Sequence, residues 1–392
     1  MSSEPAEAEL VASEGASASE RRARAWLSRA VEPGEARIHD YVQEVGAVAA
    51  AAALGSGRAP EPVQALAGAR YDEDRVTADL AAAASVGARI VVPGDQQWPA
   101  EALHAMTVAT AMGVEGIAPP QALWVRGAGD LAALTRRAVA IVGARAATSY
   151  GNEQAAQLGF GVAERGWTVV SGGAFGIDAA AHRGALSAGA PTVAVLAGGI
   201  DRSYPAAHAA LFERIAKDGL LVSEWPPGCA PYRHRFLIRN RLIAALSAGC
   251  VVVEASARSG ARHTAGRARQ LGRPVMAVPG PVTSAMSVGT HALLRDTETR
   301  LVTGVDHVIE EIGMLGEDLA PLARGSETVR DSLSATQART LDALPSRRPV
   351  LPEQVARAAG LSVLEVLSAL PALEARALVE CTDGAWRLTR QR

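Results

Sequence analysis

The sequence predicts an α/β protein with a doubly wound, mostly parallel sheet at its centre. Three observations predict this fold. Short all-apolar runs alternate with helical stretches, which is typical of parallel strands covered on both faces. Small-residue loops follow several of these runs, and the pattern stops after residue 303. The runs are 139–142, 168–170, 192–196, 220–222, 250–253 and 274–278, with helices expected at 153–164, 178–186, 205–216, 238–246 and 261–271.

The part of the chain before the sheet predicts a tail and a small helical domain. Residues 1–20 are rich in Ser, Ala and Glu, and we expect them to be disordered. Residues 21–88 are alanine-rich and helical in pattern, punctuated by Gly and Pro. The central domain is expected over 89–303, beginning with extended segments at 89–92 and 123–127.

The part of the chain after the sheet predicts a linker and a winged helix. Residues 304–335 lose the apolar pattern, whereas 336–392 regain it. In the second range, three helices precede a hairpin whose turn contains Asp383-Gly384, a pair that favours tight hairpin turns. The helices are expected at 336–344, 352–359 and 362–377, and the strands at 378–381 and 385–388.

The composition excludes several classes of protein. With 48% hydrophobic and 20% charged residues among 392, the chain is neither wholly disordered nor collagen-like. No run of about 18 apolar residues is free of charge, Gly and Pro, so we expect no membrane span. The N-terminus lacks the chemistry of a secretory signal, and the three separated cysteines form no zinc pattern or disulfide framework. These features predict a cytoplasmic protein without a metal site.

The net charge of −2 conceals a strong asymmetry. Residues 1–139 carry −6, residues 140–300 carry +7 and residues 301–392 carry −3. Within the middle block, 231–273 contains nine arginines and a single acid, Glu254. A basic region on an otherwise acidic chain predicts an anion-binding surface in the central domain.

Two glycine-containing loops follow the first two predicted strands. Glycine allows close approach of the backbone to an anion, and helix N-termini direct N–H groups at it. The alternative is that these glycines only permit tight turns. Neither loop is a GxGxxG dinucleotide motif, and no GxxxxGK[ST] loop occurs, which argues against a nucleotide cofactor. The candidate residues are Gly143, Arg145 and Ser149 in the first loop, and Ser171, Gly172, Gly173 and Gly176 in the second.

The most basic run, 232–243, interleaves arginines with aromatic residues. Guanidinium groups beside a stacking ring suit single-stranded nucleic acid, whose bases are exposed. Arg233 and Phe236 are candidate contacts on this ground. In the alternative interpretation, Phe236 belongs to the core and the arginines form a solvated face.

Three other polar residues, Asp178, His182 and Glu254, each have a possible catalytic or metal-binding role and a structural one. Asp178 and His182 are four residues apart on a predicted helix and could form an acid–base or metal pair. A structural role at the helix start is favoured, because no further ligand converges on them. Glu254 could orient an arginine or Asn240, with a catalytic base as the alternative. Ser259-Gly260 predicts another loop that begins a helix.

Seven motifs in order resemble the DNA-processing protein A (DprA, or Smf) family. They are VAIVGARAATSYG at 139–151, VVSGGAFGIDAAAHRGAL at 169–186, VAVLAGGIDRSYPAAHAAL at 193–211, LLVSEWPPG at 220–228, FLIRNRLIAALS at 236–247, VVVEASARSGARHTA at 251–265 and GRPVMAVPGPVTS at 272–284. The resemblance covers about 89–303. The N-terminal region resembles the sterile-alpha-motif-like or helix-hairpin-helix part of that family, and the C-terminal region its optional winged helix.

The resemblance implies a Rossmann-like domain that binds single-stranded DNA without catalysis. It also implies a role in bringing a RecA-type recombinase onto DNA, in DNA uptake or general recombination, and dimerisation through the Rossmann-like domain. The implied DNA contacts include the two glycine loops together with Asn240, Arg241, Ser259, Gly260 and Thr264.

The chain departs from the family pattern at two places. Phe175 stands where many members have a basic residue, so we expect one phosphate contact of the family to be missing there. Where members often read SGSLITA, this chain has Arg262 inside 259–265, which could restore charge. The main alternative function is an enzyme, a lyase or hydrolase acting on a nucleoside phosphate. A third hypothesis, a regulator that reads duplex DNA through helix 362–377, is disfavoured because that helix carries a single arginine, Arg376.

Overall fold

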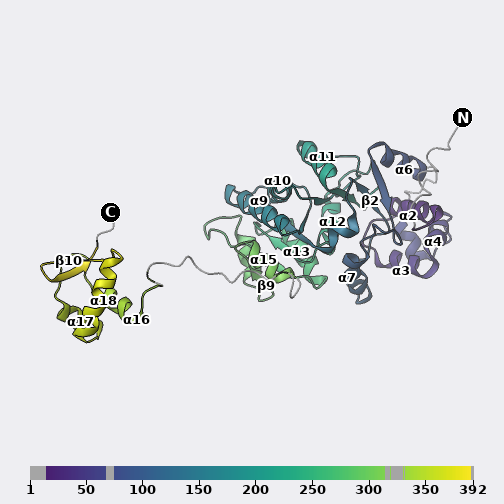
Figure 1. The fold of residues 1–392 in the computed structure, drawn as a ribbon. Helices are drawn as coiled ribbons and strands as arrows, with labels where there is room; N and C mark the ends of the chain where they lie inside the picture. The colour runs from purple at the N-terminus through teal and green to yellow at the C-terminus, as the bar shows by residue number, and fades with distance from the viewer. Residues whose placement is uncertain (1–14, 68–74, 314–317, 319–329, 331, 390–392) are drawn as a thin grey trace. The chain divides into compact units, whose positions relative to one another are not determined.

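The computed structural model describes residues 15–67, 75–313, 318, 330 and 332–389. The chain forms two compact units, Met1–Ala320 and Pro321–Arg392 (Figure 1). The first unit contains the sheet and the N-terminal helices, and the second contains the small C-terminal domain. The boundary at residue 320 falls inside the range for which a linker was predicted.

A nine-stranded sheet forms the centre of the first unit, in the order β1-β2-β6-β5-β4-β3-β7-β8-β9. All neighbours from β6 to β9 are parallel, whereas β1 and β2 add an antiparallel edge. The predicted fold class is therefore confirmed. The strands are β1 (Ala88–Val91), β2 (Leu123–Arg126), β3 (Ala138–Val142), β4 (Thr168–Ser171), β5 (Thr192–Val195), β6 (Leu220–Ser223), β7 (Cys250–Val252), β8 (Val275–Ala277) and β9 (Thr299–Leu301).

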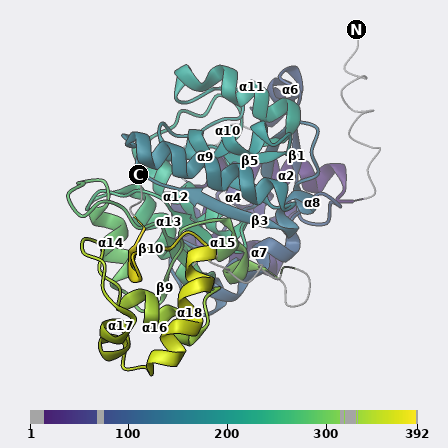
Figure 2. The same cartoon turned by 60° about the vertical axis from the view of Figure 1, so that its left-hand side comes forward.

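Helices cover both faces of the sheet, as a buried parallel sheet requires. In β3, Ala138, Ala140 and Val142 face one layer, while Val139 and Ile141 face the other. The first layer contains α7 (Ala100–Ala111), α8 (Leu131–Arg136), α12 (Arg233–Ala245), α13 (Gly260–Gln270) and α14 (Val288–Leu294). The second contains α9 (Ser149–Glu164), α10 (Ile177–Ser187), α11 (Ala209–Asp218) and α15 (Val305–Ile312). Figure 2 shows α9 and α10 side by side.

The N-terminal helices share a core with the antiparallel edge of the sheet. Trp124 of β2 is fully buried in the same cluster as Leu27 and Ile38, and its indole N–H donates to Ser28 Oγ. These helices are α2 (Ala18–Ala30), α3 (Ala36–Val45), α4 (Ala47–Gly55), α5 (Glu61–Ala67) and α6 (Arg75–Ser85). The predicted helical region at 21–88 is thus packed against the sheet by a common core.

Two predicted boundaries differ from the structure. Helix α2 begins at Ala18 and is capped by Ser17, so residues 15–20 are not part of a disordered tail; residues 1–14 lie outside the described residues. Helix α15 occupies 305–312, inside the predicted linker 304–335. Its buried face (Val308, Ile309 and Ile312) packs in the second layer, because an eight-residue amphipathic helix provides three apolar contacts at helical spacing.

The second unit has the predicted order of three helices and a hairpin. These are α16 (Ala335–Asp342), α17 (Pro352–Ala359), α18 (Val363–Ala375), β10 (Val379–Thr382) and β11 (Ala385–Leu388). Ser362 caps α18 through a capping box with Glu365. Asp383 and Gly384 have φ angles of 50° and 78°, as a tight hairpin turn with two left-handed residues requires.

Among the described residues, no single helix is long and apolar enough to cross a membrane. Only when α17 and α18 are counted together, across a bend of 106°, do length and composition reach that threshold.

Candidate nucleic-acid interface

The predicted loops meet at the carboxyl edge of the sheet, where the strand order reverses. From β3 the chain continues to β4 on one side, whereas β7 pairs with β3 on the other. Ligands of doubly wound sheets bind at this switch point. The loops after β3, β4 and β7 therefore lie together at this edge.

The helix start after β3 is occupied by an acid of the protein itself. Glu254, at the end of β7, accepts hydrogen bonds from the Thr148 N–H (2.9 Å) and the Thr148 hydroxyl (2.6 Å). A Cβ on Gly151 would lie 2.2 Å from the Glu254 carboxylate, so that glycine makes room for it. Glu254 thus holds Thr148, whose hydroxyl caps α9 by accepting the Gly151 N–H. The expectation that it orients an arginine or Asn240 is wrong, because its oxygens bind Thr148.

The other three candidate residues of the first loop differ in their surroundings: one is tightly packed and two are exposed. A Cβ on Gly143 would lie 2.4 Å from Ile177 Cγ1 and 2.9 Å from the Glu254 carbonyl oxygen, so Gly143 is required by packing. Arg145 and Ser149 are exposed. The guanidinium of Arg145 lies over the Phe236 ring, 4.9 Å from its centroid. Arg145 is therefore available to a ligand, whereas the backbone behind it is tightly packed.

The second loop is organised around two buried charged residues, Asp178 and Arg239, which interact electrostatically. The Asp178 carboxylate accepts the Ala174 N–H at 3.3 Å and backbone bonds from Gly172 and Gly143, and it faces Arg239. Burial raises the pKa of Asp178, while Arg239 and the backbone donors oppose this. Burial lowers the pKa of Arg239 to about 10, so its guanidinium is charged at neutral pH. Asp178 thus joins the β3 and β4 loops, a structural role as favoured from sequence.

The small residues of the second loop are explained by packing around this pair. Ser171 Oγ donates to the Ile141 carbonyl at 2.6 Å and is fully buried. The Gly172 carbonyl accepts Arg239 Nη1 at 3.0 Å, and a Cβ on Gly172 would lie 2.2 Å from that nitrogen. Gly173 (φ +67°) leaves space for the Phe212 ring, and Gly176 (φ +74°) for the Ala144 carbonyl. These contacts favour the alternative, tight-turn interpretation of the glycines.

His182 is a core histidine. It is buried, and its Nδ1 lies 2.8 Å from Thr192 Oγ1. Because that hydroxyl donates to the Val169 carbonyl, Nδ1–H is the donor to Thr192 and Nε2 is unprotonated. Burial and the nearby Arg239 lower the pKa of His182 to about 3. No group of three or more His, Cys, Asp or Glu side chains in the described ranges has the arrangement of a metal site.

Helix α12 has one exposed face and one buried face. On the exposed side, the centroids of the Tyr204 and Phe236 rings are 5.5 Å apart. Cζ of the buried Arg239 lies 5.9 Å from the centroid of the Phe236 ring. The Tyr232 ring, at the start of the helix, is 57% exposed, and Tyr204 is 50% exposed. We call the exposed or half-buried side chains around this face the rim. They are Arg145, Phe175, Tyr204, Tyr232, Arg233 and Phe236.

Arg241 lies on the buried side of α12 and is 0% exposed. Its guanidinium forms an ion pair with Glu224 and donates to the Ala118 carbonyl at 2.6 Å. A direct DNA contact by Arg241, expected from the resemblance, is therefore not available in this structure. A helical periodicity that alternates arginine and apolar residues does not reveal which arginine faces inwards. Its partner Glu224, in which burial raises the pKa and Arg241 opposes the shift, was not identified from sequence.

The start of α13 lies beside α12. Asn240 Nδ2 donates to the Gly260 carbonyl at 3.4 Å, and Ser259 Oγ caps the helix by accepting the Ala261 N–H. Gly260 is exposed, and a Cβ there would meet nothing within 4 Å. The other two predicted contacts in this helix differ in exposure. Arg262 is exposed and donates to the Ala257 carbonyl, whereas Thr264 is buried, with 2% of its surface exposed.

The sequence reasoning did not select Tyr204, Tyr232 or the exposed Arg202. Tyr204 and Arg202 belong to the loop after β5, and Tyr232 is the residue directly before α12. Applying the rule for strand ends to β5 as well as to β3 and β4 would have found the loop. Phe175 is 47% exposed and packs edge-on against the His208 ring, 4.5 Å away. The rim is thus richer in aromatic rings than predicted.

Fold and site together define a class: a doubly wound α/β protein with an arginine-aromatic surface at its switch point. The profile of the DNA recombination-mediator protein A family matches residues 89–313. The chain is 46% identical over 369 residues to a DNA processing protein DprA of Mycobacterium tuberculosis, covering 94% of both chains. It belongs to the DNA recombination-mediator protein A family.

Further similarities agree with this membership. The DNA processing protein DprA of Streptococcus pneumoniae is 40% identical over 182 residues, which is 46% of this chain and 64% of that protein. The X-ray structure of a Streptococcus pneumoniae DprA superposes with a TM-score of 0.58 at 28% identity, covering 75% of this chain and 96% of the other.

Proposed function

We propose that this protein is a single-stranded DNA-binding recombination mediator whose rim contacts the strand. The observation that supports this most is the arrangement of exposed rings and guanidinium groups on one face of α12. Arg145 and Tyr204 both contact Phe236, and Tyr232 and Arg233 lie one helical turn away. Aromatic rings stack on unpaired bases of any sequence, and guanidinium groups neutralise the phosphates between them.

Residues of the predicted contact set are proposed to touch DNA only where the structure exposes them. Arg145, Ser149, Arg233, Gly260 and Arg262 are exposed and stay in the proposed contact set, together with the rings of the rim. The buried members of the predicted set, such as Ser171 and Arg241, act behind the surface. Phe175 would replace a basic contact of other family members by stacking. We therefore expect binding that depends on bases as well as on phosphate charge.

Binding is tested with a fluorescent oligothymidine and the matching duplex in anisotropy titrations at several salt concentrations. We expect tighter binding of the single strand, and an affinity that falls with salt with a log–log slope of about −0.7 per neutralised phosphate. Equal affinity for the duplex, or no dependence on salt, would contradict the proposal.

Action by binding rather than by catalysis is part of the proposal. The buried carboxylates at the switch point hold parts of the protein: Asp178 binds loop N–H groups, and Glu254 binds Thr148, the capping residue of α9. A general base needs to reach a substrate proton. The enzyme alternative is tested by incubating the protein with nucleoside monophosphates and analysing products; release of base or phosphate would favour it.

The downstream partner we propose is a RecA-type recombinase, delivered onto the bound strand by a homodimer formed through the sheet domain. Family membership supports this. Light scattering measures the mass of the particle, with a dimer expected. The recombinase partner is tested by the lag in its DNA-dependent ATPase activity, which this protein should shorten; an unchanged lag would contradict delivery.

A further inference from the structure

The buried side of α12 connects the rim to the N-terminal helices. Arg235, one turn before Arg239, is 6% exposed. Its Nη2 donates to Glu32 Oε1 at 2.7 Å, and its Nη1 donates to the Ala230 carbonyl at 3.0 Å. Glu32 belongs to the turn between α2 and α3. An ion pair thus crosses from the N-terminal helices to the helix that carries the rim.

The same guanidinium lies between two aromatic rings. Arg235 Cζ is 5.3 Å from the centroid of the buried Trp225 ring and 5.2 Å from that of the exposed Tyr232 ring. Trp225 Nε1 donates to Glu32 Oε2 at 3.1 Å, so Glu32 holds both the arginine and the indole behind it. Tyr232 therefore rests on a platform that one carboxylate holds together, and its ring also lies parallel to the His234 ring, 6.0 Å away. Cation–π contacts of this kind favour one placement of the exposed ring.

We propose that Glu32 is a positioning residue for DNA binding: through Arg235 it holds the Tyr232 ring in the orientation that stacks on a base. This inference rests on the proposed function of the rim. It gives the N-terminal helices a role at the interface, although the platform residues Arg235 and Trp225 are too buried to touch DNA. Glu32 is partly buried and accepts one N–H bond from a guanidinium group and one from an indole. These two bonds fix the directions of both donor side chains.

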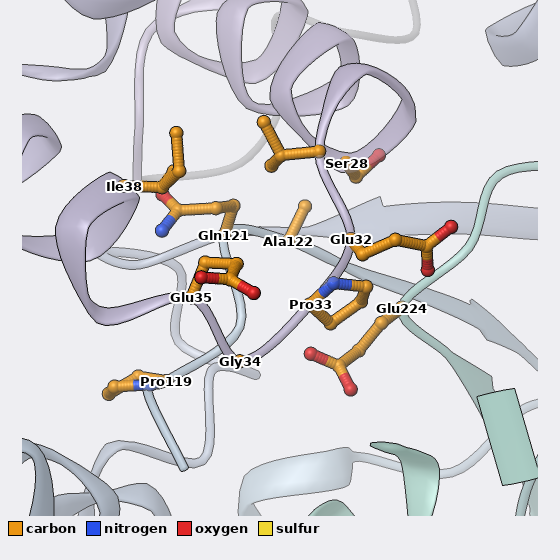
Figure 3. Close-up of a pocket in the computed structure, with 11 residues that line it drawn as sticks. Ser28, Glu32, Pro33, Gly34, Glu35, Ile38, Pro119, Gln121, Ala122 and Glu224 are labelled. Atoms are coloured by element: carbon orange, nitrogen blue, oxygen red, sulfur yellow. The ribbon is translucent and has the colours of Figure 1, made fainter. Parts of the chain in front are cut away.

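The surroundings of Glu32 provide a matched control. Glu32, Glu35 and Glu224 line a small cavity of about 20 Å³. Figure 3 shows these three side chains around it. Glu35 is exposed and makes no side-chain cap at the start of α3. Glu35→Gln removes the same charge from the same region without touching Arg235. The comparison separates positioning from a general change in electrostatic potential.

The test is a double-mutant cycle on affinity for an oligothymidine, with Glu32→Gln, Tyr232→Ala and the double variant. Stacking on one ring contributes about five-fold or more to affinity, so we expect Tyr232→Ala to weaken binding by that amount. Glu32→Gln should weaken it about three-fold or more, and the double variant should bind no more weakly than Tyr232→Ala, within a factor of two. Glu35→Gln should bind as the unaltered chain does. Because Glu32→Gln removes one partner of an ion pair, the unfolding midpoint of each variant is measured first, and affinities are compared under conditions in which every variant is fully folded.

A spectroscopic readout separates positioning from a purely structural role. An oligonucleotide with a single 2-aminopurine reports stacking by quenching of its fluorescence. Glu32→Gln should reduce the quenching at saturation, when all DNA is bound, and a shifted unfolding midpoint alone would not. Unchanged quenching, or multiplicative losses in the cycle, would overturn the inference. If the unaltered chain binds no single strand, the proposed function fails instead.

Discussion

The rim and the buried side of α12 directly beneath it both contain arginines, but these arginines differ in exposure and in their partners. We call the buried side the lower layer. Arg145 and Arg233 are exposed, whereas Arg235, Arg239 and Arg241 on the same helix or loop cluster are at least nine-tenths buried. Arg235 and Arg241 form ion pairs with Glu32 and Glu224, whereas Arg239 donates to the Gly172 and Val195 carbonyls and interacts electrostatically with Asp178. Charge at this site therefore has two uses. One set of guanidinium groups is available for a ligand, and the other holds the loops and helices that present it.

Buried ion pairs make the lower layer sensitive to single changes. Removing one partner leaves an uncompensated charge in a low-dielectric environment, which costs more free energy than the intact pair contributes. Exposed charges on the rim are solvated in the free protein, so their loss costs little stability. Variants of the lower layer should therefore lower stability, whereas variants of the rim should lower affinity with little change in stability.

The largest expected effect is that of Arg241→Ala, which removes the innermost arginine. Glu224, 2% exposed, and the Ala118 carbonyl lose their partner, so we expect the free energy of unfolding to fall by about 3–5 kcal/mol. Chemical denaturation measures this. Arg233→Ala, in the first turn of the same helix but exposed, is the control and should change stability by less than about 0.5 kcal/mol. Equal stability of the two variants would remove the distinction between the layers.

The sequence predicted the sheet and the loop positions but not the division between layers. Apolar runs such as 139–142 identify strands because both faces of the sheet are covered. In 232–243, by contrast, arginines occur on both sides of one helix, and burial depends on partners distant in sequence. Glu32 is 203 residues from Arg235, and Glu224 is 17 residues from Arg241. No local pattern reveals such pairs, so the contact set inferred by resemblance contained exposed and buried residues without distinction.

Two glycines, Gly173 and Gly260, provide a second test of the difference between buried and exposed positions at this site. Gly173→Ala should lower the free energy of unfolding by about 2–4 kcal/mol, because Gly173 has a φ of +67° and the new Cβ would meet the buried Phe212 ring at 2.4 Å. Gly260→Ala should leave stability unchanged or slightly higher, since its Cβ enters open space at a helix start. Thermal or denaturant unfolding tests both. A loss of DNA affinity in Gly260→Ala alone would support close approach of the strand to α13.

The buried layer should also determine part of the acid sensitivity. The pKa of His182 is lowered to about 3 in the folded protein, by burial and by Arg239, and is near 6.5 when unfolded. Between these values the unfolded state binds the additional proton, so stability falls as pH falls, by about 1.4 kcal/mol per pH unit from this group. His182→Gln should flatten the pH dependence of unfolding between pH 6 and pH 4, with a difference of about 2 kcal/mol at pH 5. The exposed His234→Gln is the control, and an unchanged slope in His182→Gln would contradict this assignment.

The smallest effect in free energy is the one that tests the rim most directly. Arg145→Ala should leave the unfolding midpoint unchanged, because Arg145 is exposed and lies over the half-buried Phe236 ring. It should weaken binding of single strands of every sequence by about five-fold at moderate salt and reduce the salt slope by about 0.7, as the loss of one phosphate contact requires. Anisotropy titrations at several salt concentrations measure both. Tyr204→Ala, which removes a neighbouring ring without a charge, should weaken binding with the slope retained. If Arg145→Ala lowered affinity without changing the slope, its contribution would be to hold Phe236 in place, and Arg145 would then belong functionally with the layer beneath the rim.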